Sequence, residues 1–245
     1  MRAQIIGAVV ALASIGVLAT VLAKPHEVVI SRYATPLNGR THSQRHNAEL
    51  ALGRLNGTVV KAGETFSFNA KVGSFSRDQG YRKAPVSYNG QLVDSWGGGV
   101  CQTSTTLYNT ALLAGMDILE RNRHRFAPSY VQPGRDAAVA YNSIDLKFRN
   151  PYSFPVRIQA VERNDRVEVQ ILAPQGLKVQ PKVVSQVAQV HEPGLFLIGQ
   201  PGDFGRVRNT GKNGYEVSVY RITGTRRELI SSDSYPAMHR IVQTR

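Results

Sequence analysis

Cysteine is almost absent from this chain, because Cys101 is the single thiol among 245 residues. One cysteine excludes an intrachain disulfide. It also excludes zinc sites built from cysteine pairs, and no spaced cluster of histidines or carboxylates completes a metal site around Cys101 and His124. We therefore expect neither a metal nor any other cofactor.

Acidic residues are also scarce. The chain has 17 Asp and Glu against 30 Lys and Arg, which gives a formal net charge of +13. A protein this basic is drawn to anionic surfaces such as lipid headgroups or wall polymers. It has no tight Lys/Arg run and no recognisable nucleic-acid motif, so nucleic acid is not an expected partner. The charge could equally serve only solubility and retention at such a surface.

Charge is missing altogether from residues 5–23, IIGAVVALASIGVLATVLA, which follow a short positive head containing Arg2. At about 1.5 Å per residue, a helix of this length nearly crosses a bilayer core of about 30 Å. Two interpretations remain open. One is a signal peptide cleaved after Ala23, and the other is an uncleaved signal anchor. The length of the run favours the anchor. In both cases the later residues, with a side-chain charge of +12, lie outside the cytoplasm.

The exported part is long enough for one large domain or two small ones. Helical patterns appear at about residues 41–55 and 102–114, residues 58–69 indicate two short strands, and residues 158–172 indicate a hairpin. These patterns predict an α+β fold in which a cysteine-bearing helix packs on an antiparallel sheet and a small all-β module follows. The predicted units are a membrane-targeting segment at 1–23, an α+β domain at 24–174 and a β-rich module at 175–245.

Cys101 stands where a helix begins, in the sequence GGGVCQTSTTLYNTALLAG. The first turn of a helix carries partial positive charge, which favours a thiolate over a thiol. The glycines before it allow a sharp turn and a close approach by a substrate. Gln102 or backbone N–H groups nearby could stabilise an oxyanion. These features predict a nucleophilic cysteine.

A nucleophilic cysteine needs a base, and the base needs an orienting acid. His124 follows at the end of a predicted strand, and Asp136 and Asp145 are both candidates for the acid. This order and placement resemble those of papain-like and transglutaminase-like thiol enzymes, which hydrolyse or transfer acyl groups at amide bonds.

Each candidate also has a purely structural interpretation. Cys101 could be a small buried apolar residue. His124 lies among Arg121, Arg123 and Arg125 and could belong to a basic surface patch, which would depress its pKa. Aromatic residues near the cysteine, Trp96 and Tyr130 among them, suit a carbohydrate-binding groove, although packing explains many such residues equally well.

The segments GETFSFNAKVG, GGGVCQTSTTLYNTALLAGMDILERNRH, SYVQPGRDA and DLKFRNPYSFPVRI strongly resemble the VanW-like family of bacterial cell-envelope proteins, and the resemblance runs from about residue 30 to the C-terminus. The family name implies a setting linked to vancomycin resistance rather than a known reaction. Arg125 departs from the small hydroxyl residue that is usual at its position. The resemblance implies these hallmark residues: Gly97, Gly98, Gly99, Cys101, Gln102, Ser104, Thr105, Asn109, His124, Asp136, Asp145 and Asn150.

Two functions follow from these features. The first is a thiol amidase or transpeptidase acting on peptidoglycan, with Cys101, His124, Asp136 or Asp145, and Gln102 as the catalytic group. The second is a non-catalytic module that binds peptidoglycan or an anionic wall polymer. The expected substrate-binding residues are Trp96, Gly97, Gly98, Gly99, Ser104, Thr105, Asn109 and Tyr130. Either protein would belong to the bacterial cell envelope, anchored in the membrane through residues 5–23 or secreted after signal cleavage.

Overall fold

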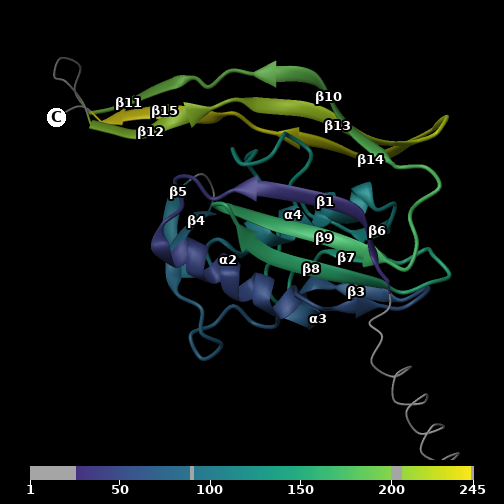
Figure 1. Cartoon of the computed structure of the whole chain (residues 1–245). Coiled ribbons are helices and arrows are strands. Elements are labelled where there is room, and N and C mark those ends of the chain that lie inside the picture. The colour runs from purple at the N-terminus through teal and green to yellow at the C-terminus, as the bar shows by residue number, and fades with distance from the viewer. Residues whose placement is uncertain (1–25, 89–90, 200–205, 244–245) are drawn as a thin grey trace, which may run out of the picture.

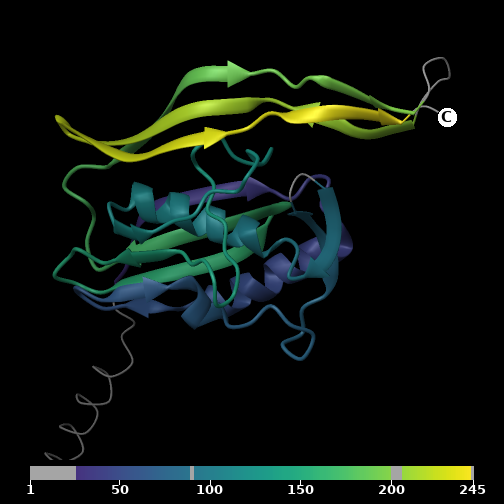
Figure 2. The same ribbon diagram turned by 180° about the vertical axis from the view of Figure 1, so that it is seen from behind.

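The computed structural model describes residues 26–88, 91–199 and 206–243, and it confirms the α+β class. Figures 1 and 2 show a lower body that contains the helices and an upper layer made of long strands alone. Residues 174–181 connect the two, between the last strand of the body and the first strand of the layer.

The centre of the body is a four-stranded antiparallel sheet in the order β1-β9-β8-β2. Its strands are β1 (Val28–Pro36), β2 (Val59–Val60), β8 (Val156–Arg163) and β9 (Arg166–Ala173). Asn164 and Asp165 join β8 to β9 with φ angles of 51° and 59°. Two successive positive φ values give the tight hairpin turn that matches strand twist, so the hairpin predicted at 158–172 is present.

Two helices pack on this sheet and on each other. Helix α2 (His42–Leu55) contacts β8, and α4 (Val100–Leu113) contacts β1 and β9. Thr41 starts α2 with a capping box, because its hydroxyl accepts from the Gln44 amide and the Gln44 side chain accepts from the Thr41 amide. The predicted packing of the cysteine-bearing helix on an antiparallel sheet is therefore confirmed.

Helix α4 is buried along almost its whole length despite its hydroxyl residues. Thr106 and Thr110 donate to backbone carbonyls one turn earlier at 2.8 Å, which satisfies hydroxyls that would otherwise be costly to bury. The polar run in the sequence therefore belongs to a buried helix.

Smaller elements complete the body. Strands β3 (Thr65–Ser67), β6 (Asp117–Glu120) and β7 (Lys147–Arg149) form one sheet, and β4 (Lys83–Tyr88) pairs with β5 (Gln91–Trp96). The prediction of two short strands over residues 58–69 missed one feature. Ser67 caps a short helix, α3 (Phe68–Val72), by accepting from the Ala70 amide.

The upper layer consists of two three-stranded sheets that follow one another along its length. One has the order β10-β13-β14 and the other β11-β15-β12. The loop between β6 and β7 rises from the body toward this layer, as Figures 1 and 2 show. The strands are β10 (Lys182–His191), β11 (Leu195–Ile198), β12 (Arg206–Lys212), β13 (Gly214–Thr223), β14 (Arg226–Tyr235) and β15 (Met238–Gln243).

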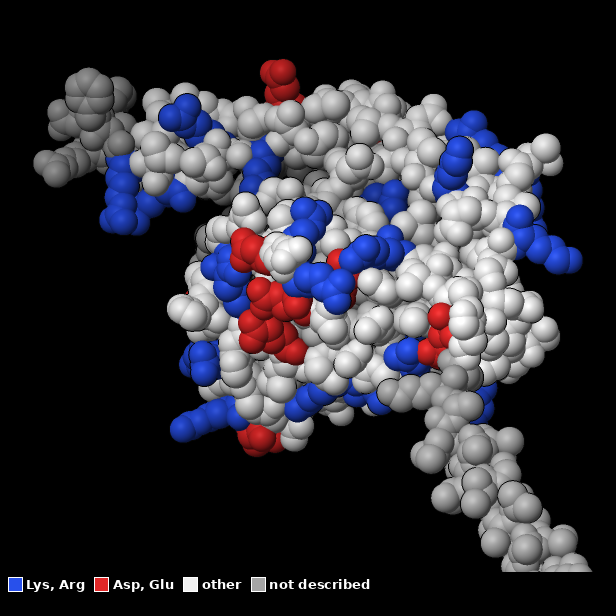
Figure 3. Space-filling model, viewed as in Figure 1, with Lys and Arg blue, Asp and Glu red and all other residues white. Residues whose placement is uncertain are grey.

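The predicted targeting segment at residues 1–23 lies outside the described residues. Within residues 26–88, 91–199 and 206–243, no helix is both long and apolar enough to span a membrane. Figure 3 shows Lys and Arg distributed over the body and the layer; the largest group of Asp and Glu in that view lies on the body, with others scattered over the body and the layer. The excess of basic residues is therefore not confined to one of the two parts.

Candidate active site

Cys101 is the second residue of α4, and its side chain is half-buried. The helix begins after Gly99, which has a φ of +108°. A Cβ at Gly99 would lie 2.3 Å from the Gln44 carbonyl oxygen, so only glycine fits against α2 here. The tight packing of the glycine turn on α2 therefore fixes where the thiol stands.

His124 and Asp136 are brought together by a short antiparallel pairing of the β6–β7 loop. Asn122 bridges Ala138, and the Ala138 amide donates to the Asn122 carbonyl at 2.7 Å. Because the two segments run in opposite directions, the position two residues after Asn122 faces the position two residues before Ala138. His124 therefore stands opposite Asp136. The His124 ring Nδ1 lies 2.6 Å from Asp136 Oδ2, and the same oxygen accepts from the His124 amide at 2.7 Å.

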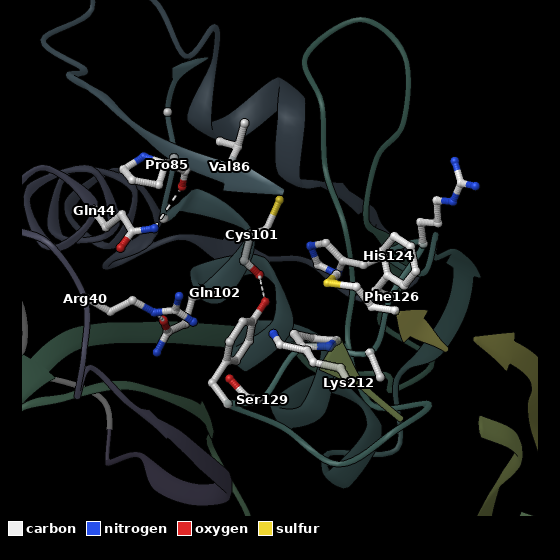
Figure 4. A pocket seen from close by; sticks show the side chains of 18 residues that line it. Arg40, Gln44, Pro85, Val86, Cys101, Gln102, His124, Phe126, Ser129 and Lys212 are labelled. Atoms are coloured by element: carbon white, nitrogen blue, oxygen red, sulfur yellow. Dashed lines mark hydrogen bonds between the residues drawn. The ribbon is translucent and has the colours of Figure 1, made fainter. Parts of the chain in front are cut away.

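The Cys101 thiol interacts with the His124 ring, and Figure 4 shows the two side chains next to each other. Burial by itself raises the pKa of Cys101, but the interaction with His124 outweighs it and the pKa is lowered. Burial lowers the pKa of His124, whereas Asp136 and Cys101 raise it to about 10. Both shifts favour the charged forms of the pair, a thiolate on Cys101 and an imidazolium on His124.

Asp136 is fully buried and stays ionised. Burial raises its pKa, but the hydrogen bond and charge of His124 and the charge of Arg121 bring it down to about 2. Arg121 donates to Asp136 Oδ1 at 3.0 Å, and the Tyr235 hydroxyl donates to that oxygen at 2.5 Å. Arg121 also makes two bonds of 2.7 Å to Asp233. Strand β14 of the upper layer therefore helps to hold the carboxylate.

A pocket of about 250 Å³ opens in front of Cys101 and His124. Figure 4 shows these two side chains at the pocket together with Arg40, Gln102, Phe126 and Lys212. Lys212, on β12, and Met238, on β15, belong to the upper layer, so both parts of the molecule line the pocket. Its lining includes Arg40, His124, Arg125 and Lys212 but no Asp or Glu.

The arrangement can perform nucleophilic acyl chemistry. A thiol with a lowered pKa, an imidazole to carry the proton, and an acid to orient the imidazole are in contact, and the pocket gives a substrate access. The Cys101 amide N–H, in the first turn of α4, has no acceptor within the described part of the chain. It is available to an oxyanion that forms on a carbonyl beside the thiol.

A family model described as VanW like protein matches residues 43–172, which contain Cys101, His124 and Asp136. The chain belongs to the VanW-like family. The uncharacterized protein YoaR of Bacillus subtilis is 40% identical over 131 residues, which are 54% of this chain and 43% of that protein. The vancomycin B-type resistance protein VanW of Enterococcus faecalis is 31% identical over 148 residues, 58% of this chain and 52% of that one.

The chain spans about half the length of these two curated relatives, and no solved structure matches it. The VanW-like match ends at residue 172, just before the end of β9. Tyr235, Asp233 and Lys212 of the upper layer therefore contact the site from outside the matched region.

Asp145, the other candidate for the acid, forms hydrogen bonds with residues other than His124. Its Oδ2 accepts from the Ser67 hydroxyl, and its Oδ1 accepts from the amides of Asn69 and Leu146 at 2.9 and 2.8 Å. It therefore fixes the start of α3 against the chain before β7. Asn150 has a similar task, since its side chain donates to the carbonyls of Val60, Lys61 and Phe154. In the VanW-like region, the carboxylate beside His124 is that of Asp136.

Gln102 was expected to supply an oxyanion donor, but its side-chain N–H groups are occupied. They donate to the Thr35 hydroxyl at 3.1 Å and to the Pro36 carbonyl at 2.7 Å. The amide oxygen of Gln102 accepts from Arg40 Nε at 2.8 Å. Gln102 is 2% exposed and anchors Arg40 rather than facing a reacting carbonyl.

Three residues expected to bind substrate instead hold the segment that carries Asp136. Ser104 donates to the Ala137 carbonyl at 2.7 Å, and Thr105 accepts from the Ala137 amide at 3.0 Å. Asn109 donates to the Arg135 carbonyl at 2.7 Å. All three side chains are fully buried. Helix α4 therefore fixes the thiol directly and the acid through its hydroxyl and amide groups.

The remaining binding candidates divide into two groups. Gly97, Gly98, Gly99 and Tyr130 line the pocket. The Tyr130 hydroxyl lies 3.4 Å from the Cys101 carbonyl oxygen, to which it can donate. Trp96 is not part of the pocket lining; it is 39% exposed, and Lys83 Nζ lies 5.7 Å from its ring centroid.

No sequence pattern points to Arg40, Asp233 or Tyr235 as site residues, and Arg121 stands out only as one member of a basic patch. Arg121 has a side chain that is only 7% exposed, and it neutralises two carboxylates. The expectation that the basic patch depresses the pKa of His124 is wrong, because Asp136 lies closer to the ring and raises it. No local motif marks Tyr235, which is 99 residues from Asp136 in the sequence.

Proposed function

We propose that this VanW-like protein is an exported, cysteine-dependent amide hydrolase or acyltransferase that acts on peptidoglycan stem peptides. The observation that carries the proposal is the contact series Cys101–His124–Asp136 at the mouth of a pocket. A buried structural cysteine needs no imidazole whose pKa is raised by a buried carboxylate. Such an arrangement is the one that thiol acyl transfer requires.

In the proposed reaction the Cys101 thiolate attacks the carbonyl carbon of an amide, and the carbonyl electron pair moves to oxygen. The Cys101 amide N–H donates to that oxyanion. His124 gives its proton to the amine as the C–N bond breaks, which leaves a thioester on Cys101. Water or a second amine, deprotonated by His124, then attacks the thioester and restores the thiolate. Asp136 keeps the His124 ring oriented throughout.

The peptidoglycan assignment is supported by the setting of the family and of the relatives. One relative bears the name of a vancomycin B-type resistance protein. The uncharged run at residues 5–23 and the excess of Lys and Arg in the exported part fit a protein held at an anionic envelope. We favour the uncleaved anchor, which keeps the pocket within reach of wall material near the membrane.

The test of the reaction is incubation of the purified chain with muropeptides that carry intact stem peptides, followed by mass spectrometry of the products. The native protein is compared with Cys101→Ala and with Ser74→Ala, whose hydroxyl lies outside the pocket. We expect a cleaved or transferred peptide with the native chain and Ser74→Ala, and none with Cys101→Ala. A mass increase on native protein quenched in acid would identify the thioester.

If the native chain and Cys101→Ala bind muropeptides equally and neither forms product, the enzyme assignment fails. The non-catalytic wall-binding module is then the correct description. Attachment is tested separately by N-terminal sequencing of the protein from membrane and culture fractions. A mature chain that begins at Lys24 would contradict the anchor, whereas an intact N-terminus in the membrane fraction supports it.

A further inference from the structure

Arg40 lies in the pocket, and none of the carboxylates in residues 26–88, 91–199 and 206–243 pairs with it. Its Nε donates to Gln102, and its guanidinium carbon is 4.8 Å from the centroid of the Tyr130 ring. These two contacts fix the plane of the guanidinium but leave both terminal nitrogens without an acceptor among the described residues. A planar guanidinium with two free nitrogens matches the two oxygens of a carboxylate.

Several other arginines of the body pair with carboxylates, whereas Arg40 does not pair with any carboxylate of the described residues. Arg32 pairs with Glu168, Arg149 with Asp117, and Arg121 with two aspartates. Burial lowers the pKa of Arg40 from its ordinary value, yet a guanidinium remains charged at physiological pH. The fold therefore keeps a positive charge partly buried at the pocket, and no carboxylate of the described residues pairs with it.

The surrounding charges reinforce this arrangement. Lys212 brings an ammonium to the pocket from the upper layer, and the pocket lining contains no acidic side chain. In Figure 4, Arg40 and His124 lie on opposite sides of Cys101. A substrate carbonyl placed at the thiol would therefore have the base on one side and the guanidinium on the other.

We propose that Arg40 is a carboxylate-binding residue that receives a carboxylate of the peptide substrate next to the amide bond attacked by Cys101. The inference rests on the proposed function and narrows its substrate to peptides with a negative charge beside the scissile bond. Gln102 and Tyr130 position Arg40, and Lys212 adds attraction without fixed geometry. A free chain end and an acidic side chain are the two sources of such a carboxylate.

The single thiol of the chain allows a test that does not need the natural substrate. Iodoacetyl-glycine and iodoacetyl-glycinamide both alkylate a thiolate, forming a C–S bond as iodide leaves with the electron pair of the C–I bond. The two reagents differ only in whether the far end is a carboxylate. Because the protein contains only one cysteine, every alkylation of a thiol, identified by peptide mass spectrometry, reports on Cys101.

The measured quantity is the ratio of the two alkylation rates at pH 7, relative to the same ratio for N-acetylcysteine amide. We expect the native chain to favour the acid reagent and Arg40→Gln to lower the ratio about tenfold, the size of a lost charge-assisted hydrogen bond. Arg40→Lys should recover part of the preference, since it keeps the positive charge but loses the two parallel N–H donors of the guanidinium. Arg32→Gln, which removes an arginine paired with Glu168 at the surface, is the matched control and should behave as the native chain.

The neutral reagent separates this inference from the proposed reaction. If all variants react alike with iodoacetyl-glycinamide while Arg40→Gln keeps the native preference for the acid, the carboxylate site is refuted and the reactive thiol stands. If the native thiol reacts no faster than N-acetylcysteine amide with the neutral reagent at pH 7, the activated cysteine of the proposed function fails instead. A misfolded Arg40→Gln would show a changed alkylation rate with the neutral reagent. In that case Arg40→Lys tests the carboxylate site, because it should keep part of the preference for the acid reagent.

A third reagent distinguishes the two sources of carboxylate. Iodoacetyl-glutamate with an amidated α-carboxyl group carries its charge on the side chain only. An Arg40-dependent preference for iodoacetyl-glycine over this reagent supports recognition of a free chain end. The opposite preference supports an acidic side chain, and no dependence on Arg40 with either reagent overturns the proposal.

Discussion

The body (residues 26–173) and the upper layer (residues 182–243) differ in how far their apolar side chains are buried. In the body, α2, α4 and the central sheet bury most of their apolar residues, and Leu107 and Ile158 are at 0% exposure. In the upper layer, strand β11 exposes all four of its apolar side chains, from 54 to 59%. Among the described residues of the layer, the buried apolar side chains are Val217 and Val219 on β13 and Tyr235 at the end of β14. A sheet with so little apolar core of its own depends on the body for its position.

The two regions also differ in what they contribute to the site. The body contains Cys101, His124 and Asp136, within the stretch that matches the VanW-like family. The layer contributes Tyr235 and Asp233, which act on Asp136 directly or through Arg121. The well-packed body therefore supplies the candidate reactive groups, and the more exposed layer supplies side chains that hold one of them in place. Changes in the body should therefore remove the chemistry, and changes in the layer should weaken it.

The largest effect is expected from His124→Gln in the body. Loss of the base should reduce kcat/KM on muropeptides by about a thousandfold or more. It should also change the pH profile of iodoacetamide alkylation. In the native chain the thiolate is present below the usual thiol pKa of about 8.5, and the imidazolium beside it persists until about pH 10. In His124→Gln the alkylation rate should instead rise with pH through about 8.5.

A native alkylation profile that already rises through about pH 8.5 would contradict the ion pair. His46→Gln is the matched control, because His46 lies on α2 outside the pocket and, among the described residues, its ring is hydrogen-bonded at the Gly80 carbonyl. Its alkylation profile should be that of the native chain.

The next effect is expected from Asp233→Asn in the layer. Arg121 would keep Asp136 but lose a partner bound by two hydrogen bonds of 2.7 Å. Removal of one partner from a buried ion pair costs about 3–5 kcal/mol, and the remaining Asp136 contact should reduce this to about 2–3 kcal/mol. The free energy of unfolding, from urea titration, measures the change. A loss below about 0.5 kcal/mol, the usual size for surface positions, would mean that the layer does not clamp the body.

Tyr235→Phe is expected to have a smaller effect, and one on activity as well as stability. It removes the hydroxyl that donates to Asp136 at 2.5 Å and that accepts from the Gly134 amide at 3.2 Å. A hydrogen bond to a charged group contributes about 1.5–3 kcal/mol, so kcat should fall about tenfold with little change in KM. Tyr220→Phe on β13 is the matched control, since its ring packs under Arg227 and its hydroxyl has no hydrogen bond among the described residues.

A purely structural role for Tyr235 would lower stability without changing kcat at a temperature where both proteins are folded. That outcome would remove Tyr235 from the site. A change in kcat would mark it as a positioning residue that acts through Asp136.

The smallest effect is expected from Leu197→Ser on β11. Leu197 is 59% exposed, so its loss should change the free energy of unfolding by less than about 0.5 kcal/mol. Ile171→Ala on β9, at 0% exposure, is its counterpart in the body and should cost about 2–5 kcal/mol. Equal effects at the two positions would show that the layer has a core of its own, and the contrast in packing between the body and the layer would then be wrong.

Much of the local structure could be predicted from the sequence. Thr41 and Gln44 mark the start of α2, and Asn164-Asp165 marks the β8–β9 turn, because caps and hairpin turns depend on residues a few positions apart. Helix α3 was missed because its five residues are too few for a periodic pattern. Asp136 and Asp145 could not be separated in the sequence, since both follow His124 in strand-like surroundings.

The single thiol after a glycine turn at the start of a helix can be recognised from adjacent residues, as can the helix at about 41–55 and the hairpin at 158–172. These features depend on hydrogen bonds between near neighbours, so they can be read from a few adjacent residues. Only the tertiary structure decided which carboxylate meets His124, that Arg121 and Tyr235 hold it, and that Arg40 is left without an acid. Tyr235 is 99 residues from Asp136, and Arg121 is 112 residues from Asp233. Such contacts depend on how the layer packs on the body, which no local pattern encodes.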